Sequence, residues 1–216
     1  MLWDDSLGWF PSPEQQQQFE QLYHQILAGN QKLNLTRITE PEAFWEKHLW
    51  DSLRGLTPLN LEPLARVSII DIGTGAGFPG LPCAIALPNA EVTLLDSTRK
   101  KIAYLKTLIP ELGLSQVSAI VGRAENIGKQ SLHHKQYDFA LLRAVSSAST
   151  CAEYALPLLK PEGIAVLYRG RWTEEEEQTV KQTLSQWGGE LLKVEAFSTP
   201  LTHSQRHCIY LKKVQT

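Results

Sequence analysis

The sequence predicts an α/β fold, with a mainly parallel, doubly wound sheet, an N-terminal helical cap and an antiparallel C-terminal pair of strands. Residues 1–62 show only the apolar spacing of helices. From residue 67 onward, short β-branched runs alternate with helix patterns, as in right-handed strand–helix–strand crossovers. Only a polar loop separates the last two apolar runs. We therefore expect a cap, residues 1–62, and a core, residues 63–216.

Composition and charge restrict the class of protein. The chain has 216 residues, of which 43% are hydrophobic and 20% charged, as is ordinary for a soluble globular protein, and no apolar run approaches the roughly 20 residues that span a bilayer. The N-terminus lacks the pattern of a signal peptide, so we expect a cytoplasmic protein without membrane contact. The net charge of −2 does not indicate general nucleic-acid binding, which would have to rest on local arginines.

The cysteines indicate a structural role. Cys83, Cys151 and Cys208 are odd in number and far apart. They have the spacing of neither disulfides nor a metal site, so we expect them to pack in the interior and expect no metal.

The cap contains two predicted helices. The first covers residues 13–28, carries an apolar stripe that includes Phe19, and ends at Gly29-Asn30. Its four glutamines, residues 15–18, are expected on a solvated face. The second opens at Glu40-Pro41, and a possible linker follows at residues 57–63. The apolar stripe of the second helix is Phe44, Trp45, His48, Leu49 and Leu53.

The core is predicted from its apolar runs. Parallel strands that are buried on both faces have near-continuous runs of this kind. The predicted parallel strands are residues 67–72, 91–95, 118–121, 137–142 and 164–168. A helix at residues 173–187 precedes two strands, residues 190–197 and 207–212, which we expect to pair antiparallel.

A glycine-rich turn, residues 71–77 (DIGTGAG), follows the first predicted strand. In open α/β sheets, ligands bind beyond the carboxyl ends of the strands, at the place where this turn lies. Gly73 and Gly75 let the backbone turn tightly and approach a ligand closely. A turn that merely connects strand and helix is the alternative.

Asp96 ends the second predicted strand, about twenty residues after the turn. A carboxylate at this place accepts hydrogen bonds from the hydroxyls of a ribose, which predicts an adenosine-containing ligand in a Rossmann-like fold. Ser97 and Thr98 follow it, either beside the adenine or as caps of the next helix.

Asp71 distinguishes two adenosine cofactors. A dinucleotide needs its pyrophosphate at the helix N-terminus, which an acidic residue would repel, whereas the amino group of S-adenosylmethionine suits a carboxylate. We therefore expect S-adenosylmethionine, with Asp71 among its contacts. The alternative for Asp71 is a strand-end carboxylate bonded to nearby backbone amides.

Two further strand ends contribute candidates. In methyltransferases of this fold the loop after the third strand lies against the adenine, which makes Ala124 and Glu125 candidates for its edge, although Glu125 also suits a helix N-terminus. Arg143 ends the fourth strand, where methyl group and acceptor should meet. It would bind a cofactor carboxylate or an RNA phosphate, or else pair with Asp138 or Glu153.

The acceptor is constrained by what the fourth strand lacks. Enzymes that methylate exocyclic amines often have an acidic or amide residue, then Pro-Pro and an aromatic, after the fourth strand, and this chain has no such motif there. Pro82-Cys83 resembles the motif of carbon methylation, but it lies in the first core helix. An acceptor with a free lone pair, such as guanine N7, needs no general base, so positioning and exclusion of water suffice.

Several motifs in one order carry a family resemblance: NLT at 34–36, KHLWDS at 47–52, the glycine turn continued by FPG at 78–80, and LLDS at 94–97. The chain resembles the small-subunit ribosomal RNA guanine-N7 methyltransferases, the glucose-inhibited division protein B family, from about residue 34 to residue 213. The resemblance implies an S-adenosylmethionine-dependent methyltransferase core that methylates N7 of one guanine in bacterial 16S ribosomal RNA.

The resemblance also implies roles for single residues. The implied cofactor contacts are Gly73, Phe78, Asp96, Ala124, Glu125 and Arg143. Arg123, Arg143, Arg206 and His207 are implied to form a basic rim that positions the RNA, with His48 and Asp51 facing the same cleft. His48 also fits a core histidine, and Arg169 stands where the family commonly has lysine, so its role stays open.

We therefore expect a monomeric enzyme that acts on 16S ribosomal RNA or the 30S subunit. A methyltransferase of another RNA or of a small molecule is an alternative. A nicotinamide-dependent oxidoreductase would need a phosphate site and a hydride-transfer residue, which the sequence does not indicate. A non-enzymatic module that senses S-adenosylmethionine or acts as an RNA chaperone would show the same cofactor site, and only turnover separates it from an enzyme.

Overall fold

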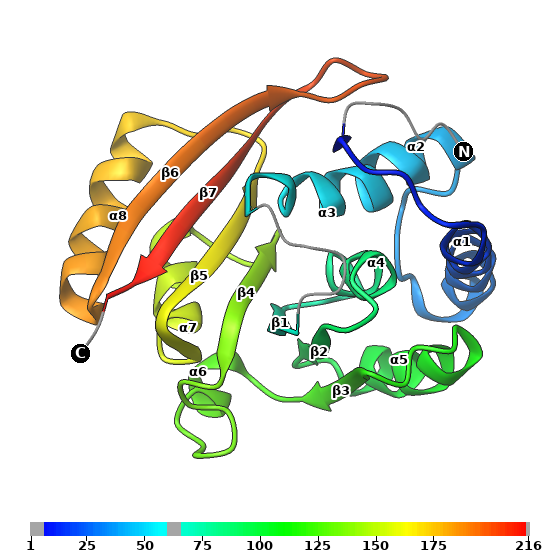
Figure 1. The fold of residues 1–216 in the computed structure, drawn as a ribbon, viewed down its shortest axis with the longest axis horizontal. Helices are drawn as coiled ribbons and strands as arrows, with labels where there is room; N and C mark the ends of the chain where they lie inside the picture. Colours follow the sequence, from blue (N-terminus) through cyan, green and yellow to red (C-terminus); the bar gives the residue numbers. More distant parts are fainter. Residues whose placement is uncertain (1–6, 60–65, 215–216) are drawn as a thin grey trace.

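The structure, a computed structural model, describes residues 7–59 and 66–214. Its centre is one seven-stranded sheet with the strand order β3-β2-β1-β4-β5-β7-β6 (Figure 1). The strands are β1 (Ser68–Ile72), β2 (Glu91–Asp96), β3 (Val117–Val121), β4 (Tyr137–Arg143), β5 (Leu159–Arg169), β6 (Gly189–Ser198) and β7 (Gln205–Lys213). The main helices are α1 (Pro13–Leu33), α4 (Gly80–Ala86), α5 (Arg99–Glu111), α6 (Ala124–Ile127), α7 (Ala148–Ala155) and α8 (Glu174–Trp187).

The sheet confirms the predicted mixture of parallel and antiparallel pairing. Strands β1 to β5 are parallel, and β6 pairs antiparallel with β7, as predicted. The sequence did not predict that β7 inserts between β5 and β6, where it runs antiparallel to both. Because β1, β2 and β4 are parallel neighbours, their carboxyl ends meet at one edge of the sheet. That edge carries the glycine turn, Asp96 and Arg143.

Alternate residues of the strands face two separate hydrophobic layers. Ile69 and Leu94 belong to the layer that includes α1, α4 and α5, whereas Ile70 and Leu95 belong to the layer formed with α6, α7 and α8. A strand turns successive side chains to opposite faces, so each layer takes every second residue. The sheet is therefore covered on both faces, as a doubly wound fold requires.

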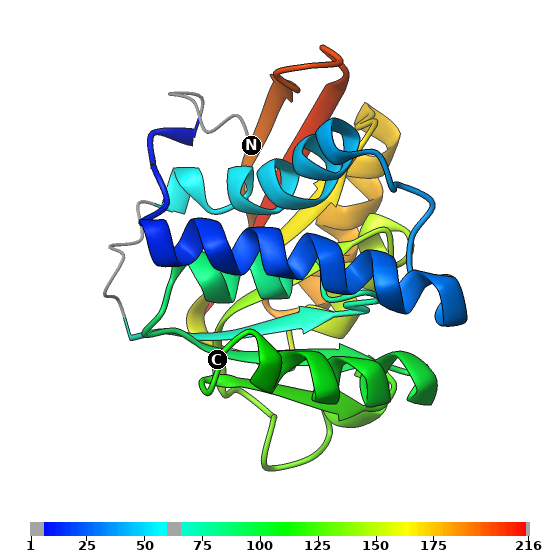
Figure 2. The ribbon, with the colours of Figure 1, turned by 90° about the vertical axis from the view of Figure 1, so that its right-hand side faces the viewer.

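The cap packs on the same face of the sheet as α4 and α5, with α1 lying across that face in Figure 2. Two tyrosines of the sheet hold the second cap helix: the Tyr168 hydroxyl donates to the Ser52 carbonyl at 2.8 Å, and Tyr210 donates to the Gly55 carbonyl at 3.0 Å. Cap and core thus share one hydrophobic layer. The predicted boundary after residue 62 lies outside the described residues, as does most of the predicted linker, so the two-part division stays a prediction.

The predicted end of the first helix is wrong. Helix α1 continues past Gly29-Asn30 to Leu33, and Asn34 caps it in the left-handed conformation. Gly29 serves packing, because a Cβ there would lie 2.4 Å from the ring of Tyr104 on α5. The expected solvated glutamine face is also partly wrong, since the Gln15 amide donates to the Ile85 carbonyl at 2.8 Å.

The second cap helix begins at Pro41, as predicted, but its middle turn is widened. Helix α2 (Pro41–Phe44) continues through a π-helical segment, η2 (Trp45–Trp50), into α3 (Asp51–Arg54), and a 3-10 turn, η3 (Thr57–Leu59), follows. The Asp51 N–H donates to the Glu46 carbonyl, five residues back. Such π segments occur often at functional sites, and this one carries His48.

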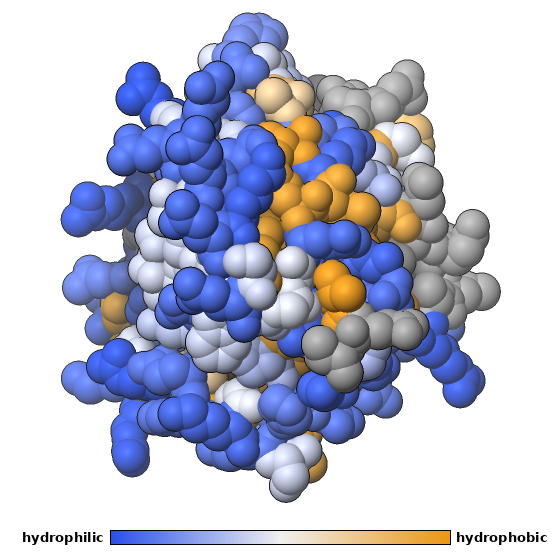
Figure 3. Space-filling view, turned by 90° about the vertical axis from the view of Figure 1, so that its left-hand side faces the viewer, coloured by the Kyte–Doolittle hydropathy of each residue, from blue (hydrophilic) through white to orange (hydrophobic). Residues whose placement is uncertain are grey.

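The face formed by α8 and the edge strand β6 is mostly hydrophilic, with one gathered hydrophobic patch (Figure 3). Trp187 and Leu192, from these two elements, are among the exposed large hydrophobic side chains. In the described part of the chain, no helix has the length and apolar character that crossing a membrane requires.

Candidate functional site

The glycine turn lies between the ends of β1 and β2. Two amides of the turn, Gly73 N–H and Thr74 N–H, donate to the Leu95 carbonyl at 2.8 and 3.0 Å, which binds the turn to β2. Gly73 and Gly75 have φ values of +72° and +60°, which favour glycine. A Cβ on Gly75 would meet no atom closer than 3.9 Å, so this part of the turn faces open space.

Asp96 connects the turn to the start of α5. One carboxylate oxygen, Oδ2, accepts from Gly75 N–H at 2.9 Å, and the other, Oδ1, accepts from Thr98 N–H at 2.8 Å. The side chain is half-buried, and each oxygen keeps a lone pair that is not used by these bonds. Asp96 is thus held at the turn by two backbone amides, and its role toward a ribose stays a prediction.

Asp71 does not occupy the predicted place. Its carboxylate is completely buried beneath the turn and lines none of the cavities described below. Oδ2 accepts from Gly80 N–H at 2.7 Å and from the Thr74 hydroxyl at 2.6 Å, while burial raises the pKa to about 6. The alternative interpretation, a carboxylate bonded to nearby amides, therefore describes Asp71.

The position of Asp71 still argues against a dinucleotide. Gly80 is the first residue of α4, and its N–H is one of the amides that a pyrophosphate would use at this helix N-terminus. Because the Asp71 carboxylate already accepts from that amide, a phosphate there would meet a negative charge. The sequence predicted this repulsion, and the structure adds that the Asp71 carboxylate already accepts from the Gly80 amide.

Two adjoining cavities lie along this edge of the sheet. The first, of about 250 Å³, is lined by Ser97, Arg123, Ala124 and Glu125. The second, of about 370 Å³, is lined by the glycine turn, Phe78 and Arg143. Gly73, Asp96 and Val145 line both, so the two cavities adjoin, and together they are called the elongated space below. Together they fall in the size range of cofactor sites, about 300–1,000 Å³.

Most predicted cofactor residues line this space, with one exception besides Asp71. Thr98 lines neither cavity, and its side chain does not cap α5 either, although it is the N-cap residue. Its backbone amide instead holds Asp96. Ser97 is exposed at the first cavity, and Glu125 lies both in the first turn of α6 and at the cavity wall, so both of its interpretations fit.

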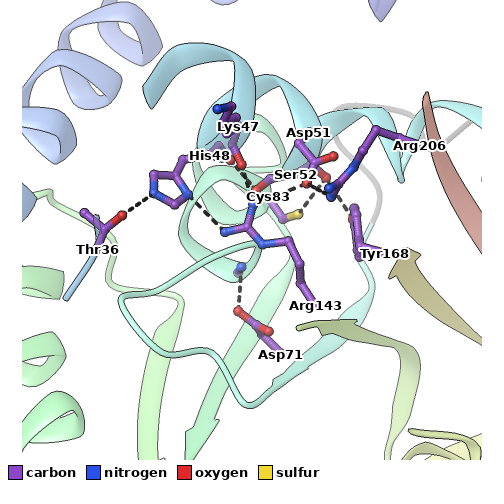
Figure 4. A network of polar contacts seen from close by, with 11 residues as sticks. Thr36, Lys47, His48, Asp51, Ser52, Asp71, Cys83, Arg143, Tyr168 and Arg206 are labelled. Carbon is purple, nitrogen blue, oxygen red and sulfur yellow. Dashed lines mark hydrogen bonds and ion pairs between the residues drawn. The ribbon is translucent and has the colours of Figure 1, made fainter. Parts of the chain in front are cut away.

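Arg143 joins the second cavity to the cap (Figure 4). One guanidinium nitrogen, Nη1, donates to the Lys47 carbonyl at 2.6 Å and to Asp51 Oδ2 at 3.3 Å. The other, Nη2, donates to His48 Nδ1 at 3.2 Å. The alternative pairing with Asp138 is wrong, because that carboxylate binds Lys160 at 2.9 Å.

The contacts of His48 fix its tautomer. A guanidinium only donates, so Nδ1 of His48 must accept from Arg143, and Nε2 therefore carries the hydrogen that it donates to the Thr36 hydroxyl at 2.8 Å. The ring stacks on Phe78 with centroids 4.4 Å apart. Burial, together with the nearby Arg143 and Lys47 charges, lowers its pKa to about 3. His48 is thus neutral, with both nitrogens occupied.

The predicted basic rim is not one cluster. Arg206 lies with Arg143, because Asp51 Oδ2 accepts from both, at 3.1 Å and 3.3 Å. Arg123 lies at the first cavity, beside Ala124 and Glu125. The adjacent side chain of His207 points to the opposite side of β7 from Arg206, where Nδ1 lies 3.2 Å from the Gly170 carbonyl.

Arg169, whose role the sequence left open, supports the cavity wall from behind. Its Nη1 donates to the Ser146 carbonyl at 2.7 Å, and its Nη2 pairs with Glu176 at 2.6 Å. Ser146 lines the first cavity, so Arg169 fixes that loop against α8. The planar guanidinium of Arg169 binds both partners at once, whereas the ammonium group of a lysine is a point charge that reaches one of them at a time.

Lys101 is a cavity residue that sequence reasoning missed. It lies half-buried in the first turns of α5 and lines the second cavity, with Nζ 4.0 Å from the position of a Cβ on Gly75. In the sequence, only its position five residues after Asp96 could have indicated that it lines the cavity. It brings a positive charge to the glycine turn.

The cysteines pack in the interior, as predicted. All three thiols are free and buried. Burial raises the pKa of the Cys83 thiol well above its usual value, with Asp71 adding to the effect. A thiol held in its neutral form is a poor nucleophile, and Cys83 lines neither cavity, so it fits the predicted packing role.

Comparisons with known proteins identify the family of this chain. Residues 15–209 match the GidB family, described as rRNA small subunit methyltransferase G. A protein of that name from Trichormus variabilis is 56% identical over 217 residues, which cover 99% of this chain and 88% of the relative. Its namesake from Synechococcus elongatus is 59% identical over 211 residues, covering 98% of this chain and 87% of the relative.

Solved methyltransferase structures share the fold at much lower identity. A SAM-dependent methyltransferase from Aquifex aeolicus has a TM-score of 0.58 at 17% identity, covering 89% of this chain and 98% of that one. M. jannaschii TYW2 in complex with AdoMet has a TM-score of 0.56 at 15% identity, covering 69% of this chain and 68% of that one. The predicted Rossmann-like methyltransferase fold is confirmed.

Proposed function

The chain belongs to the rRNA small subunit methyltransferase G family, and from this membership we infer that it is an S-adenosylmethionine-dependent enzyme that methylates N7 of one guanine in 16S ribosomal RNA. The observation that carries the proposal is the elongated cavity along the carboxyl ends of β1, β2 and β4. Asp96 lies at its middle, and Arg143 lies at the end nearest the cap.

The residues of this cavity divide the cofactor between them. Asp96 would hold the ribose hydroxyls, and Ala124 with Glu125 would line the adenine edge. The glycine turn and Phe78 would hold the methionine part in the second cavity, close to the positive charges of Lys101 and Arg143. When bound, S-adenosylmethionine supplies an electrophilic methyl group on its sulfonium.

The chain itself has to position the acceptor rather than move a proton. Guanine N7 has a free lone pair, so no base must remove a proton before attack. His48, the titratable ring nearest the second cavity, is neutral and already bonded at both nitrogens. Arg143, fixed by three cap groups, would orient the acceptor side of the cavity.

The finer parts of the function follow from this assignment. We propose a monomeric, cytoplasmic enzyme with the 30S subunit as its substrate. A net charge of −2 favours recognition of a shaped particle over general attraction to naked RNA. The cap of residues 1–62 is proposed to form the wall that faces the RNA.

Transfer of a tritiated methyl group tests the proposal. The wild-type protein should label 16S ribosomal RNA in 30S particles, whereas Asp96→Ala and Arg143→Ala should reduce labelling by more than about 100-fold. Labelling of neither naked RNA nor 30S particles by the wild type would refute the enzyme assignment.

Ligand binding tests the cofactor separately. S-adenosylhomocysteine at about 100 times its dissociation constant should increase the free energy of unfolding by roughly 2.7 kcal/mol, and NAD should not increase it. Stabilisation by NAD and not by S-adenosylhomocysteine would contradict the cofactor assignment, whatever the outcome of the transfer assay.

A further inference from the structure

A third cavity continues the elongated space on the side away from the adenine positions. It has a volume of about 340 Å³ and lies between the π segment of the cap and the turn that joins β6 and β7. His48, Arg143 and Ala144 line both it and the second cavity. A ligand group in the third cavity would therefore adjoin the methionine part of the cofactor.

The walls of the third cavity are fixed to each other. The buried Glu46 carboxylate accepts from Leu201 N–H and Thr202 N–H at 2.7 and 2.8 Å, and from the Thr202 hydroxyl at 2.8 Å. These bonds outweigh the effect of burial and lower the pKa of Glu46, so the carboxylate stays ionised. The cap thus holds the β6–β7 turn in place, and the cavity is formed in advance of ligand binding.

The hydroxyls of the turn have a defined direction of donation. Thr202 donates its hydroxyl hydrogen to Glu46, so its oxygen must accept from Ser204, whose oxygen lies 3.0 Å away. The Ser204 hydroxyl hydrogen is therefore used, and its lone pairs remain. Ser204 lines the cavity as an acceptor.

Arg206 presents the opposite polarity beside it. One of its guanidinium nitrogens donates to Asp51 Oδ2 at 3.1 Å, and its other N–H groups remain as donors at the cavity, which Arg206 lines. Arg143 donates to the same carboxylate oxygen, and Ser204 stands two residues before Arg206 and lines the same cavity, so this wall brings an acceptor and two guanidinium groups together.

An acceptor and guanidinium donors at one wall suit the edge of a guanine. Around that base, the N2 and N1 donors are followed by the O6 acceptor and then by N7. We propose that the third cavity receives the target guanine, turned out of the RNA, with its N1 and N2 hydrogens on Ser204, its O6 on Arg206 and its N7 toward the cavity of the cofactor. The proposal rests on the proposed function and names the site that selects its base.

The same arrangement would reject adenine. Adenine has an acceptor at N1 and a donor in place of O6, so it would face the Ser204 lone pairs with an acceptor and the Arg206 donors with a donor. Ile38 and Ala144 line the cavity as well, and they supply apolar surface for a base.

Matched substitutions in the β6–β7 turn test the proposal. Ser204→Phe fills the cavity, and Gln205→Phe places the same ring on an exposed neighbour that does not line it. Methyl transfer to 30S particles should fall more than about 100-fold in Ser204→Phe and less than about twofold in Gln205→Phe, with the dissociation constant for S-adenosylhomocysteine unchanged in both. Ser204→Ala, which cannot disturb folding by bulk, should lose roughly tenfold.

If Ser204→Phe transferred methyl groups at the wild-type rate, the cavity assignment would be overturned and the proposed function would remain. Absence of transfer by the wild-type protein would refute the function itself. A photocrosslink reads the contact directly. 30S particles rebuilt with 6-thioguanosine in their 16S RNA should crosslink to the peptide that contains Arg206. A crosslink confined to peptides outside the third cavity would overturn the proposal.

Discussion

The imidazole of His48 connects the cap to the cofactor cavity. It accepts from Arg143, donates to Thr36 and stacks on Phe78, so a single ring contacts the cap loop, the end of β4 and the turn after β1. The ring meets these demands only in its neutral form. Its protonation would remove the acceptor for Arg143 and place two positive charges together.

His48 therefore makes stability depend on pH. Below pH 6.5 the unfolded chain binds a proton at this residue, which the folded protein does not bind until about pH 3, so the free energy of unfolding falls as the pH falls through that interval. From about pH 7.5 to about pH 5.5, the wild type should lose roughly 1 kcal/mol more than His48→Asn, as measured by urea unfolding. Asp71, whose raised pKa gives the opposite slope, is present in both proteins and cancels. Equal losses would contradict the assigned neutral state.

Lys101 should bind the carboxylate of the methionine part. Lys101→Met should weaken binding of S-adenosylhomocysteine roughly tenfold, because it removes a charge-assisted contact at the glycine turn. Binding of 5′-methylthioadenosine, which lacks the amino-acid tail, should not change. Calorimetric titration measures both.

The control for this prediction is Lys100→Met. This neighbour is exposed on α5 and does not line the cavity, so its loss removes the same charge without the contact. Equal weakening by the two variants, or equal weakening for the two ligands, would show that Lys101 acts through general charge alone.

Single residues show what sequence reasoning reached and where it stopped. Asp96 and Arg143 were predicted because their places at strand ends follow from periodicity. The partner of Arg143 was not predicted, since Asp51 is 92 positions away and only the packing of the cap brings the two together. The burial of Asp71 was not predicted, because neither the apolar pattern nor the position at a strand end shows whether a side chain points into the cavity or lies beneath it.

At the scale of elements, the β6–β7 turn depends on one cap residue. Glu46→Ala should remove the acceptor for the Leu201 and Thr202 amides, so their hydrogen exchange should accelerate while exchange in the β5–β7 ladder stays slow. Methyl transfer should fall, with binding of S-adenosylhomocysteine retained. Exchange measured by NMR separates the two regions.

Glu42→Ala is the matched control on the same cap helix, because that carboxylate is exposed. It should leave exchange at the turn unchanged. If Glu46→Ala also left the turn protected, the cap would not be what holds it, and the preformed third cavity would lose its support.

Helices and strands with a clear apolar pattern were predicted well, whereas their ends and their pairing were predicted less well. The parallel strands and α8 lie close to their predicted positions, because apolar runs and helical spacing are local. The extension of α1 was missed because glycine usually marks a helix end, whereas Gly29 makes room for Tyr104. The insertion of β7 between β5 and β6 is a matter of long-range pairing that local patterns do not contain.

Over the whole molecule, charge is nearly balanced, and each of the three cavities carries positive side chains beside carboxylates. Lys47, Lys101, Arg123 and Arg206 line the cavities at the carboxyl end of the sheet, while the first turn of α8 carries four glutamates at residues 174–177. Attraction of RNA is therefore local, and shape has to supply the rest of the selection.

This distribution predicts a substrate preference. Initial rates of methyl transfer should be higher on 30S particles than on naked 16S RNA at the same concentration. Raising the salt concentration should lower the apparent affinity for 30S particles with a shallow logarithmic slope of about 2 to 4, since few phosphates are contacted. A slope near 10, or a preference for naked RNA, would show that backbone charge dominates recognition.

The central claim is that this site transfers a methyl group from S-adenosylmethionine to N7 of a guanine in 16S RNA. Its most direct test is mass spectrometry of nucleosides from 30S particles treated with the enzyme and S-adenosylmethionine that carries a trideuteriomethyl group. We expect labelled 7-methylguanosine at one position, and none with Asp96→Ala. Label in an exocyclic-amine or carbon-methylated nucleoside, or in none, would contradict it.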